Sequence, residues 1–447
     1  MAPLTYMELL RGNRSFRWLL AGQVVSELGN WFNFIAVLGL VRAVTGAAPE
    51  AAAVLIVLRF APFALLAPVA GALADRWSRR AVMIWTDLAR AVLALGFLLV
   101  SSEGDLWVAY ACMAALTTLS ALFEGAKNGA MPNVAGERGL LAGNALMFSS
   151  RFLLMAVGSA LGGATSDLFG YHVAFFVNAL SFVVSAYSVW LIPEGETRSP
   201  GGAAALAGGR GGLLGGVWED VRDGFRYVAG HRLVSALVGV NILWAVGGGA
   251  LSLLYERLGS VTFAGQGGLE GDRGVAFVHT AVGAGLFLGM LLARRIGAHV
   301  EVRGRVPLLI GWGIVAHGVL FALAGLMPTL WLATLMIFVS RVVIGVEFAV
   351  QDTLLLRLLP DNLRGRVVTT DRAAEIGVVS LSGIAAGWLL TGPLTPRSLT
   401  VWSGLLSAAP GLLWLLLFAT KRLTLPAKRQ DEGEEREVEE TALASAG

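Results

Sequence analysis

The sequence predicts an all-α polytopic membrane protein with twelve transmembrane helices in two pseudo-symmetric six-helix bundles. Of its 447 residues, 56% are hydrophobic and only 15% are charged, and the mean hydropathy is +0.69. Soluble domains contain about 25% charged residues. Apolar runs of about 20 residues, the length of a membrane-spanning helix, recur along the chain. Barrel strands would be about 10 residues long with alternating polarity, and that pattern is absent from the sequence.

The apolar runs form two sets of six, separated by a long polar and glycine-rich stretch. We expect helices at 16–43, 51–74, 81–101, 105–127, 140–165, 171–193, 233–257, 275–294, 306–327, 329–354, 368–391 and 398–420. The expected regions are an N-terminal bundle (1–193), a cytoplasmic linker (194–232), a C-terminal bundle (233–420) and an acidic tail (421–447). The linker ends in an amphipathic segment, Trp218–Tyr227, which we expect at the membrane surface. We expect the acidic tail to be disordered.

Basic residues gather at one set of helix ends. The ends that carry Arg76, Arg79 and Arg80 in the first half and Arg303 and Arg305 in the second are rich in arginine, whereas the opposite loops are poor in it. The positive-inside rule therefore places both termini in the cytoplasm.

The two halves carry traces of an internal repeat. Glu124 lies eight residues before Pro132, and Asp352 lies eight residues before Pro360, each at the inner end of a span. A duplicated six-span unit implies a pseudo-two-fold axis along the membrane normal, with a substrate path between the halves.

The stretch from Gly71 to Arg80, Gly-Ala-Leu-Ala-Asp-Arg-Trp-Ser-Arg-Arg, joins spans two and three. It resembles the signature loop of the major facilitator superfamily. The stretches 22–31, 170–182 and 363–367 resemble the branch that holds enterobactin exporters and macrolide efflux proteins. The resemblance implies the major facilitator fold in a bacterial inner membrane. The chain departs from it at Asn30, where relatives often carry Asp.

One polar stripe marks the first span. Gln23, Glu27 and Asn30 share a helical face, because they are spaced at i, i+4 and i+7. In an otherwise apolar helix this face should line a central cavity. Glu27 then either exchanges a proton as access alternates, or forms a structural bond to a neighbouring helix.

Further charges lie inside the predicted spans, where a charge exposed to lipid is costly. Arg151 and Arg341 are each expected to act as a counter-ion for Glu27, as a ligand for an anionic substrate group, or in a fixed ion pair between helices. Asp87 and Arg90 are three residues apart and are expected to pair with each other.

A cytoplasmic gate is expected at the arginine-rich ends. The resemblance implies that Asp75 contacts the start of span eleven, where the helix dipole favours a carboxylate. We expect Glu124 to pair with Arg76, Arg79 or Arg80, and Asp352 with Arg303 or Arg305. The alternative is that these charges serve topology alone.

Several functions find no support in the sequence. The single cysteine and five histidines show no metal-ligand spacing, and a phosphate-binding Gly-x-x-x-x-Gly-Lys loop is absent. We therefore expect no cofactor, no metal, no nucleic-acid partner and no enzymatic activity. The expected function is proton-coupled efflux of amphipathic small molecules by a monomer, with the lipid bilayer as its surroundings. The alternatives are uptake, lipid flipping, or a transporter-like sensor.

Overall fold

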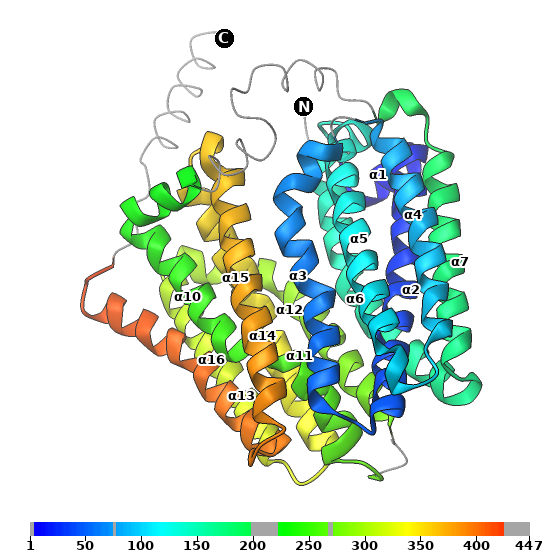
Figure 1. The fold of residues 1–447 in the computed structure, drawn as a ribbon. Helices are drawn as coiled ribbons and strands as arrows, with labels where there is room; N and C mark the ends of the chain where they lie inside the picture. Colours follow the sequence, from blue (N-terminus) through cyan, green and yellow to red (C-terminus); the bar gives the residue numbers. More distant parts are fainter. Residues whose placement is uncertain (1–3, 75–76, 198–221, 267–270, 424–447) are drawn as a thin grey trace.

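The computed structural model describes residues 4–74, 77–197, 222–266 and 271–423 (Figure 1). In these ranges every predicted span falls on a helix, and no strand is present. The first six spans, here called the N-half, are α2 (Arg14–Thr45), α3 (Pro49–Ala74), α4 (Arg79–Gly96), α5 (Leu106–Ala135), α6 (Leu140–Phe169) and α7 (Tyr171–Trp190), with a short helix α1 (Tyr6–Gly12) before them.

The last six spans, here called the C-half, begin with a broken helix. Its helices are α10 (Arg232–Gly248), α11 (Leu251–Arg257), α12 (Asp272–Val302), α13 (Val306–Leu326), α14 (Leu330–Leu358), α15 (Asp361–Leu389) and α16 (Pro396–Ala419). Within the described residues, ten helices are long and apolar enough to cross a membrane by length and composition. The other two predicted spans correspond to α3 and α15, and α15 carries several charges in its first half.

The seventh span departs from the single helix that was expected. It consists of α10, α11 and one π-helical turn at Leu258–Thr262. The break between α10 and α11 lies where the chain packs against α15. A Cβ on Gly249 would lie 2.5 Å from the carbonyl oxygen of Val379, so this approach requires glycine.

The helix packing repeats from one half to the other. In the N-half, α2 packs on α6 and α7, α3 on α5, and α4 on α5 and α7. The C-half shows the same pairings in the same order, with α10 on α15 and α16, α12 on α14, and α13 on α14 and α16. Each half is therefore a copy of one six-helix arrangement, as the sequence repeat predicted.

The halves lie side by side and meet along two helix pairs, α6 with α12 and α3 with α15 (Figure 1). Both contacts include close approaches at glycine. A Cβ on Gly283 of α12 would lie 2.5 Å from the backbone nitrogen of Ala156 in α6. A Cβ on Gly387 of α15 would lie 2.5 Å from Cβ of Ala53 in α3.

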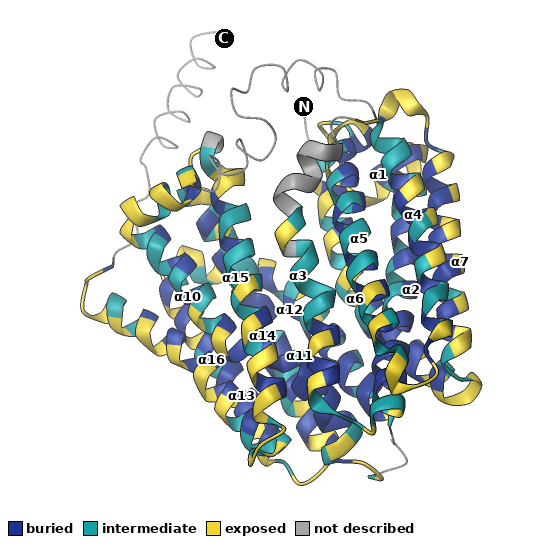
Figure 2. Cartoon of the chain, in the orientation of Figure 1, coloured by how far each residue is buried: buried dark blue, intermediate teal, exposed yellow. Residues whose placement is uncertain are grey.

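We name the two ends of the molecule by residues that lie there. The α1 end carries α1, the start of α4 and the start of α15, and lies at the top of Figure 1. The Arg42 end carries the turn from α2 to α3 and the start of α12. Figure 2 shows buried residues mainly where helices face one another. Large apolar side chains such as Trp85, Leu180 and Leu381 point outward, as expected for a surface that contacts lipid.

The described end of the linker packs against the C-half. Residues 222–230 are helical, and Asp223 forms an ion pair with Arg366 of α15 at 3.1 Å. The hydroxyl of Tyr227 donates to the carbonyl of Leu358 at 3.4 Å. The amphipathic segment therefore contacts protein at the α1 end. Residues 198–221, which hold its first part, and most of the acidic tail lie outside the described residues.

Candidate functional site

A polar cavity of about 300 Å³ opens within the N-half. The predicted stripe of Gln23, Glu27 and Asn30 lines it, as does Arg151 of α6. Glu27 Oε1 lies 3.6 Å from Arg151 Nε. The Glu27 side chain is 13% exposed, whereas that of Arg151 is 44% exposed. The structure thus pairs an acid and a base from two helices on a cavity wall, with the arginine more accessible than the acid.

A buried lysine organises the neighbouring part of this cavity. Lys127 of α5 donates to Gln23 Oε1 and to Glu124 Oε1, both at 2.7 Å. The amide nitrogen of Gln23 donates in turn to the carbonyl of Met147 in α6 at 2.9 Å. Lys127 therefore links α2, α5 and α6. Lys127 was not predicted as a site residue, although its position at the end of a predicted span was a signal.

The other charges of the N-half cavity have partners of two kinds. Arg59 lies over the rings of Phe34 and Trp31, with 4.2 and 4.9 Å to their centroids, and such contacts stabilise a cation. Arg90 contacts Asp87 within α4, which is the pairing expected from the sequence. Both Asp87 and Arg90 are buried.

A second cavity, of about 180 Å³, lies in the C-half. Arg341 and Glu347 of α14 line it, with aromatic side chains that include Trp244 and Phe348. The structure thus separates Arg341 from the stripe that holds Glu27. The two cavities are neighbours. Arg151 and Ile376 line the first, and the residues next to them in sequence, Phe152 and Glu375, line the second.

A polar network connects three C-half helices beside this cavity. Asn241 of α10 donates to Asp371 of α15 at 3.0 Å, and Gln351 of α14 donates to Asn241 at 2.5 Å. This group was not predicted from the sequence. Asp371 is a charged residue inside a predicted span, and that was the available signal.

The predicted gate residues that the structure describes lie at the α1 end, where Asp352 and Glu124 contact bases other than those expected; Arg76, one of the partners expected for Glu124, lies outside the described residues. Among the described residues, Asp352 pairs with Arg372 of α15 at 3.1 Å, and Glu124 bonds to Lys127. The reason is helix rotation, since each acid points toward a base on its own or the adjacent helix.

Two arginines at the start of α4 bond to backbone carbonyls of neighbouring helices. Arg79 donates to the carbonyl of Gly129 at 2.5 Å, and Arg80 donates to the carbonyl of Trp190. Arg303 contacts His299 at the end of α12, and Arg305 is the residue before α13. Gly71 belongs to α3, whereas Asp75 and Arg76 lie outside the described residues.

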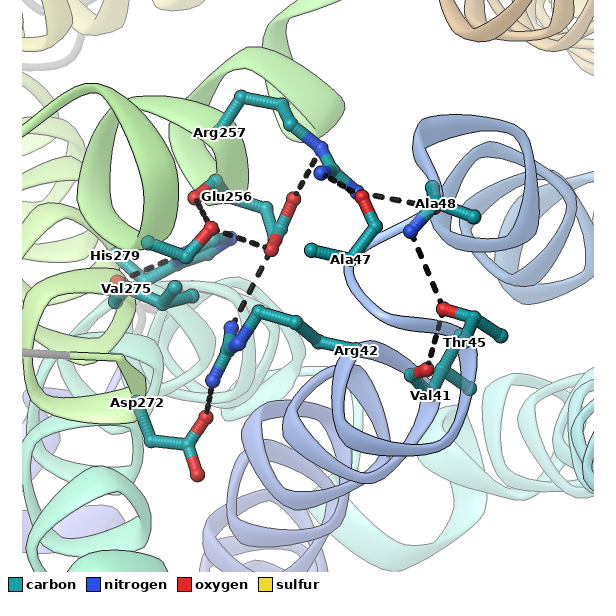
Figure 3. A network of polar contacts seen from close by, with 11 residues as sticks. Val41, Arg42, Thr45, Ala47, Ala48, Glu256, Arg257, Asp272, Val275 and His279 are labelled. Carbon is teal, nitrogen blue, oxygen red and sulfur yellow. Dashed lines mark hydrogen bonds and ion pairs between the residues drawn. The ribbon is translucent and has the colours of Figure 1, made fainter. Parts of the chain in front are cut away.

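The Arg42 end carries an ion-pair network that the sequence analysis did not predict (Figure 3). Arg42 of α2 contacts Glu256 of α11 at 3.3 Å and also contacts Asp272 of α12. Arg257 lies 2.8 Å from Glu256 and donates to the carbonyl of Ala47, in the turn after α2, at 2.6 Å. Every one of these bonds except Arg257–Glu256 joins the two halves.

A second cross-half ion pair lies at the same end. Arg273 of α12 contacts Asp167 of α6. The adjacent pairs Glu256–Arg257 and Asp272–Arg273, in loops that otherwise hold few charges, were the available sequence signal. The halves are therefore held together at the Arg42 end by charge.

Comparisons with known proteins agree with this architecture. The family model described as Major Facilitator Superfamily matches residues 19–370. The uncharacterized MFS-type transporter YfiS of Bacillus subtilis (strain 168) is 32% identical over 190 residues, which span 42% of this chain and 44% of YfiS. The match thus covers less than half of that relative. YvqJ of the same organism, also an uncharacterized MFS-type transporter, is 24% identical over 70% of this chain and 71% of its own.

Solved transporter structures share the fold. A POT family transporter in complex with a thioalcohol-conjugated peptide aligns with TM-score 0.70 and 13% identity, over 91% of this chain and 96% of that one. A single-residue mutant of the nucleoside transporter NupG aligns with TM-score 0.67 and 14% identity, over 91% and 99%. Twelve predicted spans on two repeated bundles, a central pair of cavities and the family match lead to one conclusion: this chain belongs to the Major Facilitator Superfamily and is a multi-pass membrane transporter.

Proposed function

We propose that the chain is a proton-coupled secondary transporter that exports amphipathic small molecules by alternating access. The observation that carries the coupling is the ion pair between Glu27 and Arg151 on the N-half cavity wall. A proton taken up by the Glu27 carboxylate removes its negative charge and releases the Arg151 guanidinium. Proton uptake therefore changes the charge that the cavity presents to a substrate.

The proposed orientation places the α1 end in the cytoplasm. Its support is the concentration of arginine at that end, which the positive-inside rule assigns to the cytoplasmic side. With this orientation the Arg42 network is an extracellular latch, and we propose that it is closed in the inward-facing state. We propose that the predicted cytoplasmic gate residues close the opposite end in the outward-facing state.

Two observations support the proposed direction of transport, export, and the proposed class of substrate. The first is the resemblance of three stretches to enterobactin exporters and macrolide efflux proteins. The second is the mixed lining of the N-half cavity, where Phe60, Phe63 and Met113 stand beside the charged residues. A drug, macrolide or siderophore-like molecule combines apolar area with a few polar groups in this way. We propose that the protein works as a monomer in the bacterial inner membrane.

The test of coupling is flux in proteoliposomes with and without a pH gradient. Because the substrate is unidentified, an ethidium or erythromycin probe is used to report transport. The Glu27→Gln variant keeps the shape of the side chain but cannot titrate, so its flux should no longer respond to the gradient. A gradient response equal to that of the native protein, at equal protein content, would show that the coupling group lies elsewhere.

A further inference from the structure

Two oppositely charged side chains of the C-half cavity carry polar atoms without a hydrogen-bond partner among the described residues. Glu347 is 4% exposed and Arg341 is 7% exposed. Within the described ranges, nothing bonds to Glu347 Oε1 or to Arg341 Nε and Nη2. The indole nitrogen of Trp244, which lines the same cavity, is likewise without an acceptor. Buried polar groups are normally satisfied, and unsatisfied ones are costly.

The two charges do not satisfy each other. Arg341 and Glu347 are six residues apart on α14, so their Cα atoms are separated by about 9 Å along the helix axis. The Arg341 guanidinium lies 5.4 Å from the centroid of the Tyr255 ring. That contact stabilises the cation without neutralising it.

The other polar groups around the cavity are already bonded. Glu375 pairs with Arg372 at 2.8 Å. The side-chain amides of Asn241 and Gln351 bond to each other. The cavity therefore offers a ligand three unpartnered groups: an acceptor on Glu347 and the donors of Arg341 and Trp244.

We infer that the C-half cavity binds a zwitterionic small molecule. Its ammonium group contacts Glu347, its carboxylate contacts Arg341 and the Trp244 indole nitrogen, and an apolar segment lies along Ile344 and Phe348. A ligand with a single charge would leave one buried group unpaired, whereas a zwitterion satisfies both and adds no net charge to the membrane interior. This inference rests on the proposed function, because it assigns the class of substrate that the transporter carries.

The test measures ligand binding to the full chain in lipid nanodiscs, with no gradient present. The probes are ω-amino carboxylic acids of increasing chain length, with the alkylamine and the alkanoic acid of each length as singly charged controls. Affinity is read by thermal stabilisation and by calorimetry. We expect affinity to peak at one chain length, and at that length to exceed that of either control about tenfold, which corresponds to one satisfied charged contact.

Two variants assign the ends of the ligand. Glu347→Gln should lower the affinity for the best ω-amino acid about tenfold and leave that for the alkanoic acid unchanged. Arg341→Gln should do the reverse, by sparing the alkylamine. If Arg341→Gln fails to fold, Arg341→Lys keeps a cation and should retain the preference for the zwitterion in weakened form. Arg357→Gln, at an exposed ion pair of α14, is the matched control and should bind as the native protein does.

Two results would overturn the inference. If the alkylamine binds as tightly as the ω-amino acid, the cavity is a site for cations and not for zwitterions. If no probe stabilises the protein, the cavity does not bind this class of ligand. Because binding is measured without a gradient, a failure of the Glu27 coupling experiment would leave this result intact, and the two proposals are therefore separable.

Discussion

The Arg42 guanidinium of α2 contacts Glu256 of α11 at 3.3 Å and also reaches Asp272 of α12, so that one side chain joins the N-half to two helices of the C-half. Both acids are nearly buried, with side-chain exposures of 1% and 8%. Charges in such surroundings interact more strongly than on a surface. We therefore regard this residue as the centre of the latch at the Arg42 end.

The first prediction concerns this latch. Arg42→Gln removes the cation from two buried acids and should shift the population toward states open at the Arg42 end. A change of about 1.4 kcal/mol alters the ratio of the two states about tenfold. Spin labels at the exposed positions Ala43 and Val261 should report a longer mean distance.

Arg397→Gln is the control, because Arg397 donates to the carbonyl of Met327 within the C-half and its loss should leave the distance unchanged. If Arg42→Gln matches the native distribution, the network does not latch the halves.

The second prediction concerns the opposite gate. Asp75→Asn, at a residue outside the described ranges, should loosen the seal at the α1 end without unfolding the protein, since a carboxylate near a helix start contributes about 0.3–2 kcal/mol. Labels at Trp77 and Gly365, both exposed, should move apart in this variant. Distances equal to those of the native protein would assign the Asp75 charge to topology alone.

The third prediction concerns orientation in the membrane. A cysteine introduced at Ser102, in the turn before α5, should react with an impermeant thiol reagent added to intact cells, whereas one at Trp77 should react only after lysis. The native Cys112 is buried and is replaced by serine in both proteins. The reverse pattern would exchange the two sides and make the Arg42 network cytoplasmic.

The fourth prediction concerns the buried Lys127. Lys127→Met leaves Glu124 and Gln23 without their donor and should lower the free energy of unfolding in mixed micelles by about 3 kcal/mol, the usual loss when one member of a buried pair is removed. Adding Glu124→Gln removes the unpaired acid and should restore at least about 1 kcal/mol of this loss.

Disruption of the exposed Arg357–Glu301 pair is the control, and should cost under about 1 kcal/mol. Equal destabilisation in the single and double Lys127 variants would mean that Lys127 and Glu124 act independently.

Hydropathy and charge spacing predicted most of the fold. Each apolar run is long enough to form a helix that crosses a bilayer. Gln23, Glu27 and Asn30, which their spacing placed on one helix face, line one cavity. The sequence also offered Arg151 as one counter-ion for Glu27, and the pair is present.

The choice of charged partners could not be predicted in the same way. Arg42 and Glu256 are 214 residues apart, and they meet only because the halves pack α11 against α3, the helix that follows α2. Asp352 reaches Arg372 instead of Arg303 because of how α14 and α15 are rotated. Helical periodicity places residues on faces of one helix, but it carries no information on how faces of different helices are matched.

The glycine contacts between α6 and α12 and between α3 and α15 have a mechanical consequence. At Gly283 the α12 backbone lies against the α6 backbone, and at Gly387 the α15 backbone lies against the methyl group of Ala53, so at these two points the halves meet without large interlocking side chains. Interlocked side chains would have to separate each time the halves move, and that would slow the conformational change. We therefore expect the two halves to rotate against each other about these two contacts, so that one end closes as the other opens.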